Sequence, residues 1–288
     1  MSETKEGALF LVATPIGNLS DLSKRAIETL ESADLIACED TRRTGQLLKL
    51  IGVKRKKLMR VDEHTEFKSK SEIVEKIKDG LTVALVSDAG TPGISDPGEE
   101  LVKTVIENGC NVSVIPGASS VLAALVVSGI SMKRWVMEGF IPRKGKEREE
   151  ILKELAVEER TIILFESPKR LQGTLKDMCQ HLGEDRQVAV VRELTKIHEE
   201  VWRGSLKGAM QHYDSPPKGE AVIVIEGSTH ETTISDEHIF KTLREAKDLG
   251  LSARDASNQV SKQLGVSRGR AYNCLLYTSP SPRDGLLS

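Results

Sequence analysis

Short apolar runs alternate with amphipathic stretches through the first 118 residues, and this alternation limits the possible folds more than any other feature. The apolar runs predict buried strands at residues 8–13, 34–38, 81–87 and 111–115. The stretches between them have helical spacing at residues 19–32, 41–51, 69–79 and 97–108. Strands separated by helices form parallel βαβ units, in which helices cover both faces of the sheet. We therefore expect an α/β domain over residues 1–118.

The pattern changes after a Pro-Gly turn at residues 116–120, where we place a domain boundary. Strands are predicted at residues 161–165, 187–192, 200–203 and 220–226, and helices at 146–156 and 168–181. The apolar run at 121–130 is too short to span a bilayer and predicts a buried helix. Two predicted strands lie close together within residues 187–203, which favours a mixed or antiparallel sheet. We expect a second α/β domain over residues 119–230.

The last part of the chain is polar and helical. Residues 231–273 predict a helical appendage, in which Gly265 and Ser267 separate two helices in a helix-turn-helix-like pattern. We interpret it either as an RNA-contacting or dimer-stabilising element, with Arg268 and Arg270 facing outward, or as a small packing subdomain. The final segment, residues 274–288, has two closely spaced prolines and no periodicity. We expect it to end the helix and to form a disordered or non-native tail.

Charge and cysteine content exclude several classes of protein. The formal net charge of -2 argues against a uniformly basic nucleic-acid coat but is compatible with a local basic surface. The four cysteines are scattered and form no Cys-x-x-Cys pair, so we expect reduced thiols and neither a zinc site nor a disulfide framework. Residues 1–7 have no apolar signal core, and no run of about 18 apolar residues occurs. A cytoplasmic protein without a membrane segment or metal is expected.

Four loops combine glycine, proline and small polar residues, and each follows a predicted strand. They are TPIGN at residues 14–18, SDAGTPGISDPG at 87–98, PGASS at 116–120 and FESPKR at 165–170. Ligands of open α/β sheets bind at the carboxyl ends of the strands, where these loops must lie. The chain has no P-loop, Gly-x-Gly-x-x-Gly or Gly-x-Ser-x-Gly motif, which argues against a kinase or GTPase, a dehydrogenase and a serine hydrolase.

Together with GEAVIVI at residues 219–225, these ordered blocks resemble the tetrapyrrole (corrin/porphyrin) methylase family. The second and fourth blocks, with CEDTR at 38–42 and DEHT at 62–65, resemble its ribosomal RNA small-subunit methyltransferase I subfamily. The resemblance spans residues 9–227 and implies the two-domain class III methyltransferase fold, which binds S-adenosylmethionine between its α/β domains as a homodimer. It also implies 2′-O-methylation of a cytidine ribose in the decoding region of 16S rRNA, with the 30S subunit as the expected partner.

The resemblance also implies a cofactor site. The expected cofactor-binding residues are Pro15, Asp88, Ala89, Gly90, Thr91, Ile94, Ser119, Ser120, Phe165 and Ala221. Asp88 can accept hydrogen bonds from the cofactor's ammonium group or ribose hydroxyls, or it can bind only the amides of its own loop.

A ribose hydroxyl is a weak acid, so methyl transfer to it benefits from a nearby base. The candidates are His64, Glu39, Asp40 and Glu166, all polar residues near predicted strand ends. His64 can instead be a surface or packing residue, and Glu166 can form a structural ion pair with Arg170.

Basic residues beside the motif loops are candidates for binding RNA phosphates. They are Arg42, Arg43, Arg143, Lys144, Lys169 and Arg170, with Lys146 nearby, whereas the run at 54–57 can equally be solvated surface. The small number of aromatic residues argues against extensive base stacking and favours recognition of shape and phosphate. Two alternatives remain: a methyltransferase of a small corrin or porphyrin, and a non-catalytic ribosome assembly factor with this fold.

Overall fold

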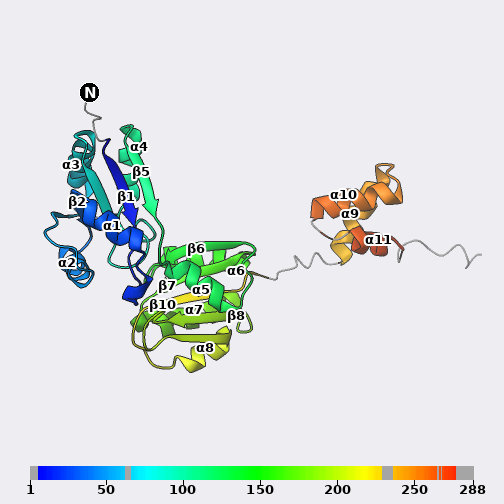
Figure 1. Cartoon of the computed structure of the whole chain (residues 1–288). Helices are drawn as coiled ribbons and strands as arrows, with labels where there is room; N and C mark the ends of the chain where they lie inside the picture. The colour runs from blue at the N-terminus through cyan, green and yellow to red at the C-terminus, as the bar shows by residue number, and fades with distance from the viewer. Residues whose placement is uncertain (1–5, 62–65, 229–235, 265, 267, 277–288) are drawn as a thin grey trace, which may run out of the picture. The chain divides into compact units, whose positions relative to one another are not determined.

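The structure is a computed structural model that describes residues 6–61, 66–228, 236–264, 266 and 268–276. The chain divides into two compact units, residues 1–228 and 229–288, which are described separately below. In the first unit, β5 leads from one five-stranded sheet to helix α5, which packs on a second five-stranded sheet (Figure 1).

The first sheet is entirely parallel, as the sequence predicts, with strand order β3-β2-β4-β1-β5. Its strands are β1 (Ala8–Val12), β2 (Leu35–Cys38), β3 (Leu58–Arg60), β4 (Thr82–Val86) and β5 (Asn111–Ile115). Strand β3 was not expected from the sequence because it is short and only half-buried, so it has no continuous apolar run. The carboxyl ends of all five strands meet at one edge of the sheet, where the first three motif loops begin.

Helices cover both faces of this sheet because its central strands are apolar on both sides. Helices α1 (Lys24–Ser32) and α2 (Thr41–Leu50) pack on the face that contains Ile36 and Ala84. Helices α3 (Glu66–Lys78) and α4 (Glu99–Glu107) pack on the face that contains Leu35 and Leu85. The first predicted helix starts later than expected: a short 3-10 turn, η1 (Leu19–Asp21), comes first, and the Ser23 side chain caps α1.

The second sheet is mixed, as the close spacing of its strands predicts, with order β6-β7-β10-β8-β9. Its strands are β6 (Trp135–Phe140), β7 (Thr161–Glu166), β8 (Gln187–Arg192), β9 (Glu200–Ser205) and β10 (Ala221–Ile225). Only the β6–β7 pair is parallel. Strand β6 was missed by the sequence analysis: it lies at an edge of the sheet without a clear alternation of burial, and its register shifts between Met137 and Gly139.

Three helices cover one face of the second sheet and a single helix covers the other. Helices α6 (Lys146–Val157), α7 (Pro168–Leu182) and α8 (Leu206–His212) share one apolar core with the strands. Helix α5 (Ser120–Ser128) packs alone on the opposite face. It is less buried than the apolar run predicts, because Leu122 and Val126 are 52% and 65% exposed on its outer side.

The second unit is a small bundle of three helices, α9 (Asp236–Asp248), α10 (Ala253–Leu264) and α11 (Arg268–Leu276). The expectation that the helix ends before Cys274 is wrong: α11 includes this residue, and Cys274 and Leu275 are buried in the core of the bundle with Ala271. These three positions share one helical face, so the apolar stripe continues up to the proline-containing segment. Arg268 is exposed, whereas the Arg270 side chain and residues 277–288 lie outside the described part of the chain.

The sequence also led to expectations about membrane segments, disulfide bonds and metal sites. Within the described ranges, no helix combines the length and apolarity needed to cross a bilayer. Cys38, Cys110, Cys179 and Cys274 are thiols that form no disulfide bond among the described residues. Among the same described residues, no three metal-binding side chains come together.

Candidate active site

Loops from both sheets of the first unit surround a cavity of about 390 Å³. A cavity of this size falls within the range of sites for cofactors and small molecules. The first-sheet loops and the start of α2 contribute Ile16, Glu39, Arg43, Asp88, Ala89, Gly90, Thr91, Ile94, Ser95 and Asp96. The rest of the lining is Ser119, Ser120, Val121, Phe140, Phe165, Glu166, Ser167, Pro168, Val191, Glu193, Leu194, Lys196, Glu220, Ala221 and Val222.

The structure brings most of the predicted cofactor residues into this one cavity. Asp88, Ala89, Gly90, Thr91, Ile94, Ser119, Ser120, Phe165 and Ala221 line it, and Pro15 does not. Of the predicted catalytic residues, Glu39 and Glu166 line the cavity, whereas His64 lies outside the described residues. Of the predicted RNA-binding residues, only Arg43 lines it; Arg42, Arg143, Lys144, Lys169 and Arg170 do not.

Hydrogen bonds from backbone and side-chain groups join the first three motif loops. Thr14 and Gly90 form an antiparallel bridge, with N–O distances of 2.8 Å and 3.1 Å between their amides and carbonyls. The Thr91 hydroxyl donates to the Ala118 carbonyl of the third loop at 3.3 Å. Gly90 has φ +84°, a left-handed conformation that glycine adopts without steric cost. The three loops therefore form one connected wall.

A loop that the sequence analysis did not single out completes the wall. The segment between β8 and β9, residues 193–199, is the β8–β9 loop, and Glu193, Leu194 and Lys196 in it line the cavity. It packs against Gly17, where a Cβ atom would lie 2.8 Å from the Leu194 carbonyl oxygen. Glu193 and Thr195 have φ of +48° and +65°, which is unusual for residues other than glycine.

The sheet register explains why this loop reaches the cavity. Strand β10 is antiparallel to β7 and β8, so Ala221 pairs with Glu166 on one side and with Arg192 on the other. The amino end of β10 therefore lies at the same sheet edge as the carboxyl ends of β7 and β8. Once the strands are paired, the end of each strand and the loop after it can be placed at this edge, but the pairing itself cannot be obtained from apolar spacing alone.

The polar side of the cavity is acidic. The Asp88 Oδ2 atom forms an ion pair with Arg43 Nη1 at 3.0 Å. Burial raises the pKa of Glu39, and the nearby Asp88 and Asp96 raise it further. Burial also raises the pKa of Asp96. Six acidic side chains line the cavity against two basic ones, Arg43 and Lys196, and this excess of acidic groups favours a cationic ligand.

One of these carboxyl oxygens has no protein partner. The Asp88 Oδ1 atom is buried, and among the described residues nothing donates a hydrogen bond to it. A buried carboxylate oxygen without a donor costs about 1–3 kcal/mol or more, which a bound ligand with N–H or O–H groups would recover. The amides of its own loop therefore do not donate hydrogen bonds to Asp88 Oδ1.

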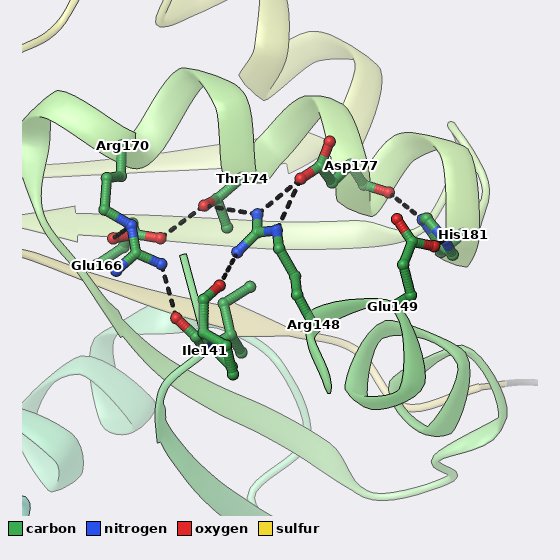
Figure 2. Close-up of polar contacts among 9 residues, drawn as sticks. Ile141, Arg148, Glu149, Glu166, Arg170, Thr174, Asp177 and His181 are labelled. Carbon is green, nitrogen blue, oxygen red and sulfur yellow. Dashed lines mark hydrogen bonds and ion pairs between the residues drawn. The ribbon is translucent and has the colours of Figure 1, made fainter. Parts of the chain in front are cut away.

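Glu166 differs from Glu39 although both line the cavity. Its side chain is fully buried, and its Oε1 accepts hydrogen bonds from the Ser167 amide at 2.7 Å and is 3.2 Å from Arg170 Nε. Its Oε2 accepts from the Thr174 hydroxyl at 2.6 Å (Figure 2). Both oxygens are thus occupied, and the geometry favours the structural role of Glu166 over a role as a base.

Asp40 is likewise occupied by a structural contact. Its side chain caps α2 by accepting from the Arg42 amide at 2.8 Å, and it binds the Arg42 guanidinium at 2.7 Å and 3.1 Å. These bonds from Arg42 hold the pKa of Asp40 well below its usual range. A carboxylate stabilised in this way is a weak base, so Glu39 is the better candidate at this end of β2.

Apolar side chains also line the cavity. The rings of Phe140 and Phe165 lie 5.4 Å apart and are tilted by 46°. Ile94, Val191 and Val222 add aliphatic surface. A flat ring can be held between such side chains while its polar groups meet the backbone of the Gly/Pro loops.

Comparison with known proteins shows the family of the chain. Residues 8–209 match the model of the family described as Tetrapyrrole (Corrin/Porphyrin) Methylases. A protein of Synechocystis sp. named ribosomal RNA small subunit methyltransferase I is 45% identical over 273 residues, which cover 94% of this chain and 98% of that protein. This chain belongs to the ribosomal RNA small subunit methyltransferase I family of tetrapyrrole methylases. Relatives of the same name include a Thermotoga maritima protein, 45% identical over 77% of this chain and 99% of its own length.

Solved structures confirm the class III methyltransferase fold of this family member. Diphthine synthase matches with a TM-score of 0.59 at 14% identity, covering 76% of this chain and 90% of that chain. The cobalt precorrin-4 methyltransferase matches with a TM-score of 0.56 at 18% identity, covering 77% and 95%. At these identities the likeness concerns the fold alone, and the methyltransferase activity follows from family membership.

Proposed function

We propose that this methyltransferase uses S-adenosylmethionine to methylate the 2′-hydroxyl of a cytidine ribose in the decoding region of 16S rRNA. The observation that carries the cofactor assignment is the buried Asp88 Oδ1, which has no hydrogen-bond partner among the described residues, in a cavity lined by acidic and apolar side chains. These features fit a ligand with an ammonium group, hydroxyl groups, a sulfonium charge and a flat purine ring. The rRNA target is supported by the names of the relatives, which are 39–45% identical.

The residues that would hold the cofactor are those of the cavity wall. Asp88 would accept hydrogen bonds from its ammonium or hydroxyl groups, and backbone groups of Gly90 and Ser119 would contact its polar ends. Phe165 and Ile94 would contact the purine. When bound, S-adenosylmethionine supplies an activated methyl group, so the protein needs to supply alignment and a route for the hydroxyl proton.

Glu39 is the proposed acceptor of that proton. It lines the cavity, its pKa is raised, and a carboxylate with a raised pKa is a stronger base than an ordinary one. Glu166 would instead hold the wall of the cavity in place through its three bonds. His64 remains a candidate from the sequence for the same catalytic step.

We further propose that the enzyme acts in the cytoplasm on the 30S subunit and as a homodimer. Exposed apolar side chains on the edge strand β5 and on α5, Val114, Leu122 and Val126, support the homodimer because they leave apolar surface for a second copy. The proposed α/β domains cover residues 1–118 and 119–230, and the helical unit at 231–273 would assist RNA binding or dimer contacts.

The decisive assay is transfer of a tritiated methyl group to 30S subunits, with mapping of 2′-O-methyl positions. Label in 16S rRNA is the expected result. Label in a precorrin but not in rRNA would contradict the rRNA proposal and support a tetrapyrrole substrate. Absence of S-adenosylmethionine binding by calorimetry would support a non-catalytic assembly factor instead.

The cofactor assignment has its own test in Asp88→Asn. The substitution keeps the side-chain shape but removes the charge, so cofactor affinity should fall about ten- to a hundredfold, the value of a charged hydrogen bond. Asp34→Asn is the matched control, because Asp34 accepts from the Thr82 amide at 2.8 Å and is not part of the cavity lining. Equal affinities in both variants would refute the role of Asp88.

A further inference from the structure

Two arginines hold consecutive main-chain carbonyls in the segment that follows β6. Arg170 Nη2 donates to the Ile141 carbonyl at 2.7 Å, and Arg148 Nη1 donates to the Pro142 carbonyl at 2.8 Å. Figure 2 shows both guanidinium groups directed at this segment from two different helices. We call residues 141–145 the basic loop, because it carries Arg143 and Lys144.

The Arg148 guanidinium is itself fixed in a buried position. Its side chain is 8% exposed, and Nε and Nη2 donate to Asp177 Oδ2 at 2.9 Å and 2.7 Å. Nη2 also donates to the Thr174 hydroxyl at 3.1 Å. With three nitrogens engaged by α7 and by the basic loop, Arg148 has one orientation available.

Arg170 connects the same loop to the cavity wall. Its Nε lies 3.2 Å from Glu166 Oε1, and Glu166 lines the cavity. Thr174 donates to the other oxygen of Glu166, so both arginines belong to one buried network. The position of the basic loop is thereby coupled to the wall of the active site.

The basic loop carries two exposed cations. Arg143 and Lys144 are exposed, and no ion pair joins either of them to another residue in the part of the chain that the structure describes. By contrast, Arg42 and Arg160 bind adjacent carboxylates. The loop begins directly after Phe140, which lines the cavity. Unpaired cations next to a site for a nucleotide favour binding of a phosphate.

We propose that Arg148 and Arg170 are positioning residues for the RNA substrate. They hold the basic loop so that Arg143 and Lys144 meet the phosphates that flank the nucleotide to be methylated. Arg170 thereby takes an indirect role in place of the direct phosphate contact expected from the sequence. A loop fixed before binding loses less conformational entropy when it captures RNA. This inference rests on the proposed rRNA substrate.

The experiment measures the salt dependence of RNA binding by an Arg148→Lys variant. A lysine keeps the charge, but its single ammonium cannot hold Asp177 and the Pro142 carbonyl in the same forked geometry. If the loop cations lose their position, the slope of log affinity for 16S rRNA against log salt should fall by about 1.4, which corresponds to two phosphates of single-stranded RNA. The affinity for 16S rRNA should fall about three- to thirtyfold.

Arg186→Lys is the matched control. Arg186 also donates to two main-chain carbonyls, those of Glu226 at 3.2 Å and Ala156 at 2.7 Å, but it precedes β8 at the sheet edge opposite the cavity. This variant should lose stability without a change in the salt slope. An Arg148→Lys slope equal to that of wild type would overturn the inference.

A double-substitution cycle separates positioning from general damage. In an R143A/K144A background, Arg148→Lys should have almost no further effect on RNA affinity, because the cations that it positions are absent. Additive effects in this cycle would overturn the inference. If Arg148→Lys does not fold, Arg170→Lys enters the same cycle, because it releases the Ile141 carbonyl. If the wild-type protein transfers no methyl group to rRNA, both the proposed function and this inference are overturned. If the wild type is active but the substitutions have additive effects on RNA affinity, only the inference is overturned.

Discussion

Gly17 lies where the first motif loop and the β8–β9 loop meet, and it gives the sharpest test of how the cavity is closed. A Cβ atom at this position would lie 2.5 Å from Lys196 Cγ and 2.8 Å from both the Leu194 carbonyl oxygen and Thr195 Oγ1. The two side chains can rotate away. The carbonyl can move only with the backbone of the β8–β9 loop, which is already constrained by left-handed residues.

We therefore expect Gly17→Ala to destabilise the first unit by about 1–3 kcal/mol, the usual cost of an extra methyl group in a packed site. It should also weaken S-adenosylmethionine binding, because Ile16 and Leu194 on the two sides of the contact line the cavity. Both tryptophans, Trp135 and Trp202, belong to the first unit. Urea unfolding followed by tryptophan fluorescence therefore reports on this unit, and calorimetry measures cofactor affinity.

Gly173→Ala is the matched control. Gly173 lies within α7, and a Cβ added there would have no atom within 4 Å apart from its chain neighbours and the nearby backbone of its own helix. This substitution should stabilise the protein by about 0.5–1 kcal/mol through helix propensity and leave cofactor affinity unchanged. If Gly17→Ala has the stability and cofactor affinity of wild type, the loops do not meet as described and the reasoning is refuted.

Three further substitutions test separate parts of the structure. Thr174→Val removes the hydroxyl that donates to Glu166 and accepts from Arg148, so two buried charged groups each lose a hydrogen-bond partner. The free energy of unfolding, measured by urea unfolding, should therefore fall by about 2–4 kcal/mol. Burial raises the pKa of Glu39, so the single-turnover methylation rate should rise with pH through that raised value, and Glu39→Gln should remove this rise and slow transfer at least about a hundredfold. Burial raises the pKa of Tyr213 from 10.0 to about 12, so the folded state retains this proton more strongly than the unfolded state. Stability should then fall as the pH rises above 10.0. Urea unfolding of the Tyr213→Phe variant at several pH values should not show this pH-dependent loss of stability.

Sequence patterns identified the elements that have a strong apolar periodicity or a continuous apolar run. Strand β4 and helix α7 have strong apolar periodicity, and both form close to the expected residues. The elements that were missed, β3, β6 and α8, are short or partly exposed, so their apolar positions do not stand out from the surrounding loops. Helix α11 shows the opposite difficulty, because its last apolar residues precede a proline-containing segment that dominates the local composition.

The loops of the candidate site were predictable where they follow parallel strands. They were less predictable where their position depends on which strands pair with each other. The loops at residues 87–98 and 116–120 follow strands whose direction in a parallel sheet is known, so their meeting at one edge follows from the fold. The β8–β9 loop reaches the cavity through the antiparallel pairing of β8 with β10 and through the positive φ of Glu193 and Thr195. Neither feature has a signature in residue spacing. The hydrogen bond from Thr174 to Glu166 also depends on the folded structure. The sequence alone therefore could not decide between a structural and a catalytic role for Glu166.

The arginines that hold the basic loop bind its peptide carbonyls and not its side chains. Every amino acid has such a carbonyl, so the path of the loop does not depend on which side chains occupy positions 143 and 144. Charge, size and polarity at these two exposed positions can therefore change while the scaffold that presents them stays the same. The proposed RNA contact can therefore be redesigned at these two positions without altering the carbonyls that Arg148 and Arg170 bind.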